Sequence, residues 1–348
     1  MNNSKRHLIL SNQNITDALE QLNELAIDAI LFVVDEQNRL IGSLTDGDVR
    51  RGILSGKQLT DSVAEFIQPN PKYIRKGDYS LSEIIEYRNK NLRILPVLDS
   101  EDRVITIVNF RHLRSYLPLD AVIMAGGRGE RLKPLTDNKP KPLLPVGEKP
   151  IIEHNVDRLI AYGIDDFWIS LKYLGNQIES YFKDGSSKGV SIRYTWENEA
   201  LGTIGALGKI FSFKNNHVLV LNSDLLTNLN YEDFFLDFLE KEADFSVLSI
   251  PYKVDVPYAI LETDQHRVVD FKEKPSYNYF ANGGIYLLKK ELVDYIPKDA
   301  FYDATDLMKD LIMRGKKVIS YPLRGYWLDI GNPADYQKAQ EDINHIVF

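Results

Sequence analysis

The chain has 348 residues, of which 44% are hydrophobic and 26% are charged, and its formal net charge is −8 at pH 7. This length predicts two domains of a soluble globular protein, and the acidic balance argues against a nucleic-acid-binding surface. No segment approaches 18 uninterrupted apolar residues, and the N-terminal apolar run is too short for a signal peptide, so we expect no membrane association. Cysteine is absent, which excludes disulfides, a Cys-based zinc site and a thiol nucleophile and fits a reducing cytoplasm.

The N-terminal third contains an internal repeat. The segment ILFVVDEQNRLI, residues 30–41, aligns without a gap on ILPVLDSEDRVI, residues 94–105, at an offset of 64 residues. Each copy predicts a helix, a strand, a polar turn at Asp35 or Asp99, a second strand and a final helix, the last of which ends within residues 111–120. Each copy alone is too small for a good core, so we expect the two copies to pack against one another.

The repeat resembles a tandem pair of cystathionine-β-synthase (CBS) domains. The segment that carries the resemblance is IGSLTDGDVRR, residues 41–51. In this family the Thr and Asp of a Gly-h-h-Thr-x-x-Asp element commonly hold the phosphate and ribose of a nucleotide, which implies a regulatory nucleotide site at Thr45 and Asp48. The same two side chains would also cap the helix that follows. Ligand binding and a role in assembly alone therefore remain two interpretations of this domain.

The second copy departs from the nucleotide-binding pattern. Asn109 and His112 stand at the positions of Thr45 and Asp48, so the resemblance implies one nucleotide site at most. Tandem CBS units commonly pair through their helices, which implies a homodimer or a larger homo-oligomer. We expect the two copies at about residues 5–62 and 63–117 of an α+β domain that spans residues 1–118.

From residue 119 onward, short apolar runs alternate with helical periods. Strands are predicted at residues 121–125, 167–173, 191–197 and 217–224, and helices at 151–163, near 176–183, near 203–210 and at 231–243. This alternation predicts a Rossmann-like α/β domain over residues 119–348, in which a mostly parallel sheet carries helices on both faces. Ligands of such sheets bind beyond the carboxyl ends of the strands.

The most informative segment is AVIMAGGRGERLKPLTDNKPKPLLPV, residues 121–146. An apolar strand runs into a glycine-rich loop, and cations follow at Arg128, Arg131 and Lys141. The exposed N–H groups of such a loop, with a helix N-terminus behind them, suit a polyanion. Fixed cations around the loop indicate bound phosphates. The spacing matches neither the dinucleotide-binding GxGxxG pattern nor a GxxxxGK[ST] P-loop.

The ordered motifs GGRGERLKPLT, KPKPLLPV, LGTIGAL, LNSD, FKEKP, NGGIY and WLDIG resemble those of the sugar-1-phosphate nucleotidylyltransferases, over about residues 120–340. The resemblance implies that a sugar-1-phosphate oxygen attacks the α-phosphorus of an NTP and releases pyrophosphate. In such a reaction the protein mainly aligns two anions and neutralises their charge. No side-chain base is needed, because the nucleophile is already ionised at neutral pH.

The resemblance also implies roles for individual residues. Arg131 would bind the triphosphate and the departing pyrophosphate, and Lys141 would neutralise the α-phosphate region. Asp224 and Asp329 would hold Mg²⁺, a hard cation that prefers oxygen ligands. The implied nucleotide-binding residues are Ala125, Gly126, Gly127, Glu197, Gly202 and Thr203, with Glu197 at the guanine edge. The implied sugar-phosphate-binding residues are Tyr258, Glu273, Lys274, Asn282 and Gly283.

The overall arrangement resembles CBS-fused enzymes that make nucleotide sugars for surface glycans, among them guanylyltransferases of legionaminic acid biosynthesis that accept glucosamine-1-phosphate. We therefore expect GTP and glucosamine-1-phosphate as substrates. TTP, UTP or CTP, and mannose-, glucose- or heptose-1-phosphate, remain alternatives. A rival from another class is a catalytically inactive protein that senses a nucleotide through its CBS pair. The joint presence of Arg131, Lys141, Asp224, Lys274 and Asp329 argues against this rival.

Overall fold

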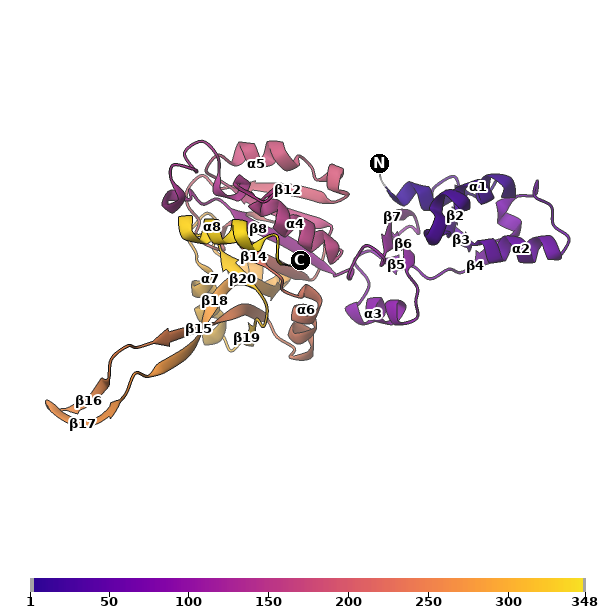
Figure 1. Cartoon of the computed structure of the whole chain (residues 1–348). Coiled ribbons are helices and arrows are strands. Elements are labelled where there is room, and N and C mark those ends of the chain that lie inside the picture. Colours follow the sequence, from indigo (N-terminus) through magenta and orange to yellow (C-terminus); the bar gives the residue numbers. More distant parts are fainter. Residues whose placement is uncertain (1–2, 347–348) are drawn as a thin grey trace. The chain divides into compact units, whose positions relative to one another are not determined.

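The computed structural model of the chain describes residues 3–346. It divides into two compact units, which Figure 1 colours from indigo to yellow along the sequence. The first unit holds the chain up to Pro118 together with Ala161–Gly163, and the second holds Leu119–Ile160 and the chain from Ile164 onward. Within residues 3–346, no helix is both long enough and apolar enough to cross a membrane.

The first unit contains two small sheets, with strand orders β1-β2-β3-β4 and β5-β6-β7. Its main core lies between the first helix and the first sheet, where Ile15, Leu22, Leu31 and Leu44 are almost completely buried. The elements are η1 (Asn3–His7), β1 (Leu8–Leu10), α1 (Ile15–Leu25), η2 (Ala26–Asp28), β2 (Leu31–Val34), β3 (Leu40–Leu44), α2 (Asp46–Leu54), η3 (Val63–Glu65), β4 (Gln68–Pro69), β5 (Ile74–Arg75), α3 (Leu81–Asn89), β6 (Ile94–Leu98) and β7 (Val104–Asn109).

The internal repeat is confirmed by two turns with the same hydrogen bonds. Asp35 accepts from the backbone N–H of Arg39 at 2.8 Å and from its Nε at 2.7 Å. Asp99 accepts from the backbone N–H of Arg103 at 3.0 Å and from its Nε at 2.9 Å. The two turns also pair with each other through an antiparallel bridge between Arg39 and Arg103. The two copies therefore pack against one another, as the sequence predicted.

The helix predicted at the end of the second copy was wrong. Residues 110–118 form turns and irregular structure instead. In the first copy, Thr45 and Asp48 form a capping box that starts α2. In the second copy Asn109 starts a tight turn instead, because its Oδ1 accepts from the N–H of Arg111 at 2.9 Å and its Nδ2 donates to Asp28 at 2.7 Å. The Asn109 side chain, at the position where Thr45 caps α2 in the first copy, therefore forms other hydrogen bonds and caps no helix.

The second unit is built on a seven-stranded sheet with the order β12-β11-β8-β13-β18-β15-β19. All neighbouring strands are parallel except at β18, which is antiparallel to both β13 and β15. The mostly parallel α/β sheet expected from the sequence is confirmed. The elements up to the middle of this unit are β8 (Leu119–Ala125), η4 (Glu130–Leu132), η5 (Lys141–Leu143), β9 (Pro145–Val146), β10 (Lys149–Pro150), α4 (Ile151–Ala161), β11 (Asp166–Leu171), α5 (Gly175–Phe182), η6 (Ser186–Lys188), β12 (Ser191–Trp196), η7 (Gly205–Lys209), β13 (His217–Asn222) and β14 (Leu225–Thr227).

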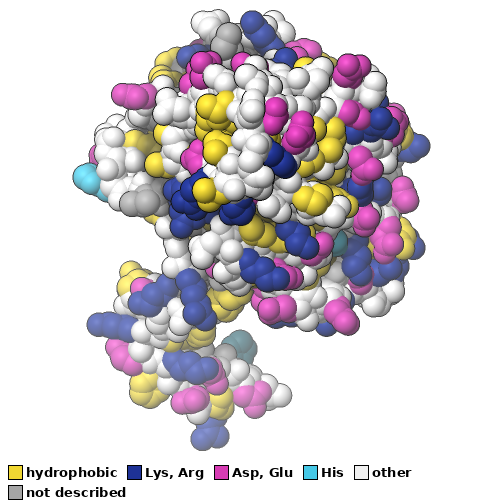
Figure 2. Space-filling model, turned by 90° about the vertical axis from the view of Figure 1, so that its right-hand side faces the viewer, with side chains coloured by type: hydrophobic (Ala, Val, Ile, Leu, Met, Phe, Trp, Pro, Cys, Tyr) yellow, Lys and Arg dark blue, Asp and Glu magenta, His cyan; other side chains and the backbone are white. Residues whose placement is uncertain are grey.

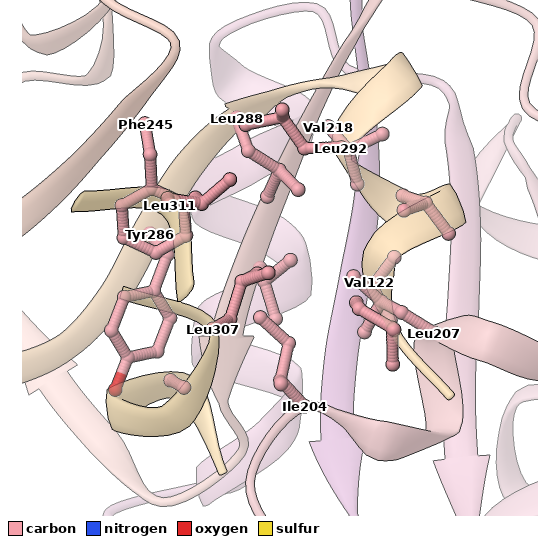
Figure 3. Close-up of a cluster of buried hydrophobic side chains, with 14 of the residues drawn as sticks. Val122, Ile204, Leu207, Val218, Phe245, Tyr286, Leu288, Leu292, Leu307 and Leu311 are labelled. Carbon is pink, nitrogen blue, oxygen red and sulfur yellow. The ribbon is translucent and has the colours of Figure 1, made fainter. Parts of the chain in front are cut away.

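The remaining elements complete the sheet and cover it. They are α6 (Tyr231–Glu240), β15 (Phe245–Asp255), β16 (Ile260–Asp264), β17 (Arg267–Lys272), β18 (Ser276–Lys289), η8 (Lys290–Tyr295), α7 (Ala304–Met313), β19 (Val318–Pro322), β20 (Trp327–Asp329) and α8 (Pro333–Asp342). Figure 3 shows the core on one side of the sheet, where Val122, Val218 and Leu288 meet Leu307 and Leu311 of α7. The helix predicted near 203–210 is the short 3-10 helix η7, in a segment that contains three glycines, at 202, 205 and 208.

One part of the second unit leaves this core. Beyond Ser249, β15 and β18 continue as a two-stranded ribbon that leads into the hairpin of β16 and β17. We call residues 250–281 the arm. Figure 1 shows it extending away from the sheet, and almost all of its side chains are exposed or only half-buried.

Protonation of His217 should make the second unit less stable at low pH. Its ring packs edge-on against Phe235 and Phe238 at centroid distances of 5.1 and 5.6 Å. Burial, with the nearby charge of Lys289, lowers the pKa of His217 to about 4. In the unfolded chain His217 binds a proton near pH 6.5, whereas in the folded chain it stays neutral until about pH 4. The free energy of unfolding should therefore fall by roughly 1–3 kcal/mol as the pH is lowered from 6.5 towards 4.

We therefore expect thermal unfolding followed by circular dichroism to show a larger drop in Tm between pH 7.5 and pH 5 for the wild type than for His217→Gln. The glutamine variant keeps a polar side chain but cannot titrate. An equal drop in both proteins would contradict this role of His217.

Candidate active site

The glycine-rich loop follows directly on the central strand. β8 ends at the buried Ala125, and Gly129 adopts a φ of +64°, which favours glycine. A Cβ on Gly126 would lie 2.8 Å from Oε1 of Glu197, and one on Gly129 would lie 2.9 Å from Cβ of Lys141. The loop backbone is thus in close contact with its neighbours. The helix expected behind the loop was wrong, because η4 is a three-residue 3-10 helix.

A cavity of about 290 Å³ lies at this loop, beyond the carboxyl ends of β8, β11 and β13. This is where an α/β sheet presents its ligand site. The residues that line it are Met124, Gly126, Gly127, Lys141, Pro142, Lys172, Glu197, Ala200, Leu201, Gly202, Thr203, Asn222, Ser223, Asp224 and Phe301. The structure therefore gathers the glycine loop, Lys141, Glu197, Thr203 and Asp224 at one cavity, although they come from five separate parts of the sequence.

A charged cluster at the edge of the cavity joins three distant parts of the sequence. Lys141 Nζ binds the carboxylate of Asp224 and lies 3.9 Å from Oδ1 of Asp329. The two carboxylates are held together by the short antiparallel pair of β14 and β20, in which Leu225 pairs with Asp329. The N–H of Ile330 donates to the carbonyl of Asp224 at 3.1 Å, which fixes the register next to the site.

Burial and the charge of Asp224 raise the pKa of Asp329, and the positive charges of Lys141 and Arg131 act in the opposite direction. The Arg131 guanidinium lies beside Gly331, two residues after Asp329, where a Cβ would be 3.2 Å from Nη2. Arg131 is therefore a neighbour of this cluster, although it does not line the cavity itself.

The two carboxylates fit a divalent cation. Oδ1 of Asp224 and Oδ1 of Asp329 are buried and have no hydrogen-bond partner. A buried carboxylate oxygen without a partner is costly unless a cation binds it. Two carboxylates, with phosphate oxygens and waters to complete the shell, are a ligand set that suits Mg²⁺.

Glu197 lies at the wall of the cavity and is 8% exposed. Ser170 Oγ donates to its Oε1, and the N–H of Leu201 donates to its Oε2 at 3.1 Å. Each oxygen keeps acceptor capacity beyond these bonds. Glu197 therefore shapes the cavity, and its contact with a guanine edge stays a prediction.

Gly202 and Thr203 also line the cavity. Gly202 has a φ of +77°, and a Cβ there would lie 2.6 Å from the carbonyl oxygen of Tyr302. Thr203 is tied to the start of α7, because its N–H donates to Asp303 at 2.8 Å and its Oγ1 accepts from the N–H of Ala304 at 2.8 Å. Thr203 is therefore held in place by the start of α7, one hundred residues further along the chain.

The residues predicted to bind the sugar phosphate are not brought together. Asn282 and Gly283 lie at the base of the arm, where Trp327 Nε1 donates to the carbonyl of Gly283 at 2.8 Å. Tyr258, Glu273 and Lys274 lie on the arm itself, and none of them lines the cavity. Their assignment to the sugar phosphate stays a prediction.

In the first unit, Thr45 and Asp48 are occupied with each other. Thr45 Oγ1 donates to Asp48 at 2.6 Å, and Arg51 pairs with the same carboxylate at 2.5 Å. Burial alone would raise the pKa of Asp48, but hydrogen bonds from Thr45, Gln68 and Arg51 lower it on balance. A cavity of about 620 Å³ in this unit is lined by parts of β3, α3 and residues 70–79, and by neither Thr45 nor Asp48.

Sequence reasoning missed several residues of the active-site cavity. Lys172 follows the end of β11 and Asn222 is the last residue of β13, so the rule for parallel sheets could have identified them. Phe301, which lies just before α7, carried no such signal, because only tertiary packing brings it to the cavity.

Comparison with known proteins places the chain in a family. A family model described as nucleotidyl transferase matches residues 120–345, and a CBS domain model matches residues 7–55. The first match covers more than half of the chain. The chain therefore belongs to the nucleotidyl transferase family, and it carries a CBS domain at its N-terminus.

Individual relatives are named as sugar-1-phosphate nucleotidylyltransferases. The chain is 31% identical over 233 residues to the D-glycero-alpha-D-manno-heptose 1-phosphate guanylyltransferase of Aneurinibacillus thermoaerophilus, covering 66% of this chain and 100% of the relative. It is 32% identical to the UTP–glucose-1-phosphate uridylyltransferase of Synechocystis sp., covering 64% of this chain and 62% of that protein, so it spans less than two thirds of that relative. The crystal structure of HddC from Yersinia pseudotuberculosis complexed with GMP-PN has a TM-score of 0.50 and 27% identity, covering 64% of this chain and 99% of that chain.

Proposed function

We propose that this protein transfers a nucleoside monophosphate from an NTP to a sugar-1-phosphate and releases pyrophosphate. The observation that carries the proposal is the cluster of Lys141 with Asp224 and Asp329, in which Lys141 and Asp224 line the cavity that opens at the glycine loop. The catalytic domain would span residues 119–348. Residues 1–118 would form a regulatory or assembly module of two CBS copies, at about 5–62 and 63–117.

The chain's own residues account for the chemistry that this reaction needs. Gly126 and Gly127 line the cavity, and their N–H groups would bind phosphate oxygens. Lys141 is held by Asp224 and cannot swing freely, so its ammonium group stays where the α-phosphate would lie. Arg131, beside Gly331, is available to the departing pyrophosphate. Positioned cations of this kind lower the barrier to phosphoryl-group transfer without a proton-transferring residue.

Asp224 and Asp329 would hold Mg²⁺ through the two oxygens that have no hydrogen-bond partner. The ion would neutralise charge on the phosphate oxygens and help to orient them. Lys141, which pairs with Asp224, would share the neutralisation of the reacting phosphate.

We propose GTP as the nucleotide and glucosamine-1-phosphate as the acceptor. GTP is supported by a relative named as a guanylyltransferase and by a solved relative complexed with GMP-PN. It is also supported by the buried carboxylate of Glu197 at the cavity wall, which could accept from the N1 and N2 donors of guanine. The uridylyltransferase relative keeps UTP as the alternative.

The test is pyrophosphate release with Mg²⁺ across GTP, ATP, UTP, TTP and CTP, each with several sugar-1-phosphates that include glucosamine-1-phosphate. We expect one strong combination, GTP with the aminosugar phosphate, and a loss of rate with EDTA. Strong turnover with another base would replace GTP in the proposal. No turnover in any combination, repeated with nucleotides added as effectors of the CBS module, would favour a nucleotide-sensing protein without catalytic activity.

A further inference from the structure

Three neighbouring strands of the large sheet end at the same level beside the cavity. β11 pairs with β8 on one side and with β12 on the other, and the last pairs of both ladders meet at Leu171. The residues that directly follow the three strand ends are Gly126, Lys172 and Glu197, and all three line the cavity. The N–H of Glu197 donates to the carbonyl of Leu171 at 2.9 Å, so the ladder continues one residue beyond the strand ends.

The side chains at these three positions meet on one face of the sheet. Residues at matching positions of adjacent strands point the same way, and adjacent strands lie about 4.8 Å apart. A Cβ on Gly126 would lie 2.8 Å from Oε1 of Glu197 and 3.4 Å from Cβ of Lys172. A side chain at position 126 would therefore collide with Glu197, and glycine leaves the space beside the two charged residues open.

Lys172 and Glu197 differ from the other charged residues that line the cavity. Lys141 and Asp224 pair with each other. Two neutral donors hold the carboxylate of Glu197 in place and leave it its charge. Within residues 3–346, the ammonium group of Lys172 forms no hydrogen bond and no ion pair. The cavity thus presents a fixed acceptor next to a donor that has no protein partner.

A half-buried lysine of this kind is unlike the basic side chains of the surface. Figure 2 shows Lys and Arg side chains dispersed among Asp and Glu side chains on one face of the molecule. On such a surface water solvates the charged groups, and an ion pair adds little stability. At a cavity the ammonium group loses part of its water, so an acceptor supplied by a ligand would form a stronger, charge-assisted hydrogen bond.

Some nucleobases offer complementary groups side by side. Guanine carries its O6 acceptor next to the N1–H and N2–H donors, and uracil and thymine carry O4 next to N3–H, whereas adenine and cytosine carry an amino donor next to a ring-nitrogen acceptor. A lysine has only donors and an ionised glutamate has only acceptors. The pair of Lys172 and Glu197 therefore fits the keto bases and disfavours the amino bases. Phe301, which lines the same cavity, suits the face of a ring.

We propose that Lys172 is a specificity-determining residue that donates to the keto oxygen of the base, beside the ring N–H from which Glu197 accepts. The nature of the ligand rests on the function proposed above, because that function makes the cavity a nucleotide site. The pair then sets a rule for the base: a keto group next to a ring N–H is accepted, and an amino group at that place is rejected. Lys172 belongs to none of the sequence motifs that carry the family resemblance, so only the register of the three strands assigns it this role.

The first test measures nucleotide binding without a sugar-1-phosphate, so that no transfer takes place. Isothermal titration calorimetry with Mg²⁺ compares the binding of GTP, ITP and ATP to the wild type and to Lys172→Met. We expect the wild type to bind GTP and ITP more tightly than ATP. Lys172→Met should weaken the binding of GTP and ITP by a factor on the order of 10 to 100 and leave that of ATP nearly unchanged, because only GTP and ITP carry a 6-keto oxygen.

Two results of this titration would overturn the role of Lys172. An equal loss of affinity for GTP and ATP would show that the lysine binds the phosphates, and unchanged affinity for all three nucleotides would show that it binds no part of them. Lys172→Arg keeps the charge and the donors, so it should keep the preference for GTP over ATP.

The matched control is Lys309→Met, the same substitution at a side chain of α7 that is 74% exposed. It should change none of the three affinities. The Tm of Lys172→Met should equal that of the wild type, because the lysine has no protein partner to lose. Loss of affinity with an unchanged Tm excludes an effect through folding.

The second test separates the role of Lys172 from the function on which it rests. In steady-state kinetics, Lys172→Met should raise KM for GTP and leave kcat nearly unchanged, because the base is remote from the reacting α-phosphate. Wild-type turnover without a preference for GTP over ATP would overturn the role of Lys172 and leave the transfer reaction in place. Selective GTP binding that Lys172→Met abolishes, with no turnover for any sugar-1-phosphate, would do the reverse. A wild type that binds no nucleotide would overturn both.

Discussion

Replacing Asp224 by asparagine is expected to lower kcat/KM for pyrophosphate release by a factor on the order of 100 to 1,000. The variant loses the negative charge that faces Lys141 and would hold Mg²⁺, while its backbone bond to Ile330 and its size remain. Folding should therefore be retained, with a Tm close to that of the wild type. Steady-state kinetics over a range of Mg²⁺ concentrations, with circular dichroism for folding, measure both quantities.

The matched control for Asp224 is Asp294→Asn, the same substitution at an exposed position of the same unit. It should leave kcat/KM and Tm unchanged. If Asp224→Asn kept turnover within about tenfold of the wild type, Asp224 would not be a metal ligand in this reaction. The cluster of Lys141, Asp224 and Asp329 would then be a structural ion pair.

Replacing Lys141 by methionine is expected to affect stability and turnover together. The Lys141 side chain is 11% exposed and is the cation between two carboxylates. Its loss leaves Asp224 and Asp329 facing one another, and removal of one partner from a buried pair costs about 3–5 kcal/mol. Because Asp329 is 44% exposed, solvent screening reduces this to about 2 kcal/mol, which corresponds to a drop in Tm of roughly 4–8 °C.

Mg²⁺ should counteract this loss of stability. A divalent cation at the two carboxylates replaces the missing charge, so millimolar Mg²⁺ should raise the Tm of Lys141→Met more than that of the wild type. Turnover should stay low, because the ammonium group that faces the reacting phosphate is gone. Thermal unfolding with Mg²⁺ and with EDTA separates the two effects.

Lys149→Met serves as the control for Lys141. Lys149 is half exposed and pairs with Asp157 at 2.6 Å, so its loss should cost at most about 1 kcal/mol and should not respond to Mg²⁺. Equal Mg²⁺ responses in Lys141→Met and the wild type would contradict a shared site for the cation and the lysine.

Local patterns in the sequence predicted much of the fold. The gapless match between residues 30–41 and 94–105 predicted two copies that pack together, and the paired turns at Asp35 and Asp99 confirm it. The alternation of apolar strands and helices predicted the parallel sheet. Both succeed for the same reason, because strand and turn preferences depend on neighbours close in the sequence.

Two expected helices were wrong, and in one of them a local preference competed with a distant contact. A helix was expected after β7, but Asn109 bonds to Asp28, eighty-one residues earlier, and forms a turn instead. A helix was expected behind the glycine loop, but only three residues of 3-10 helix follow it. Propensity cannot register such contacts, because it contains no information about residues far along the chain.

By itself, the sequence determined the glycine loop, the acidic strand end at Asp224 and the family motifs, since each is a short pattern with a local physical meaning. Only the tertiary structure decided that Asp329 lies beside Asp224, because β14 and β20 pair residues about one hundred positions apart. It also decided that Thr45 and Asp48 hydrogen-bond to each other and that Lys274 lies on the arm, outside the lining of the cavity. Which charges meet depends on how distant strands pair, and that pairing is fixed by the packing of the whole unit.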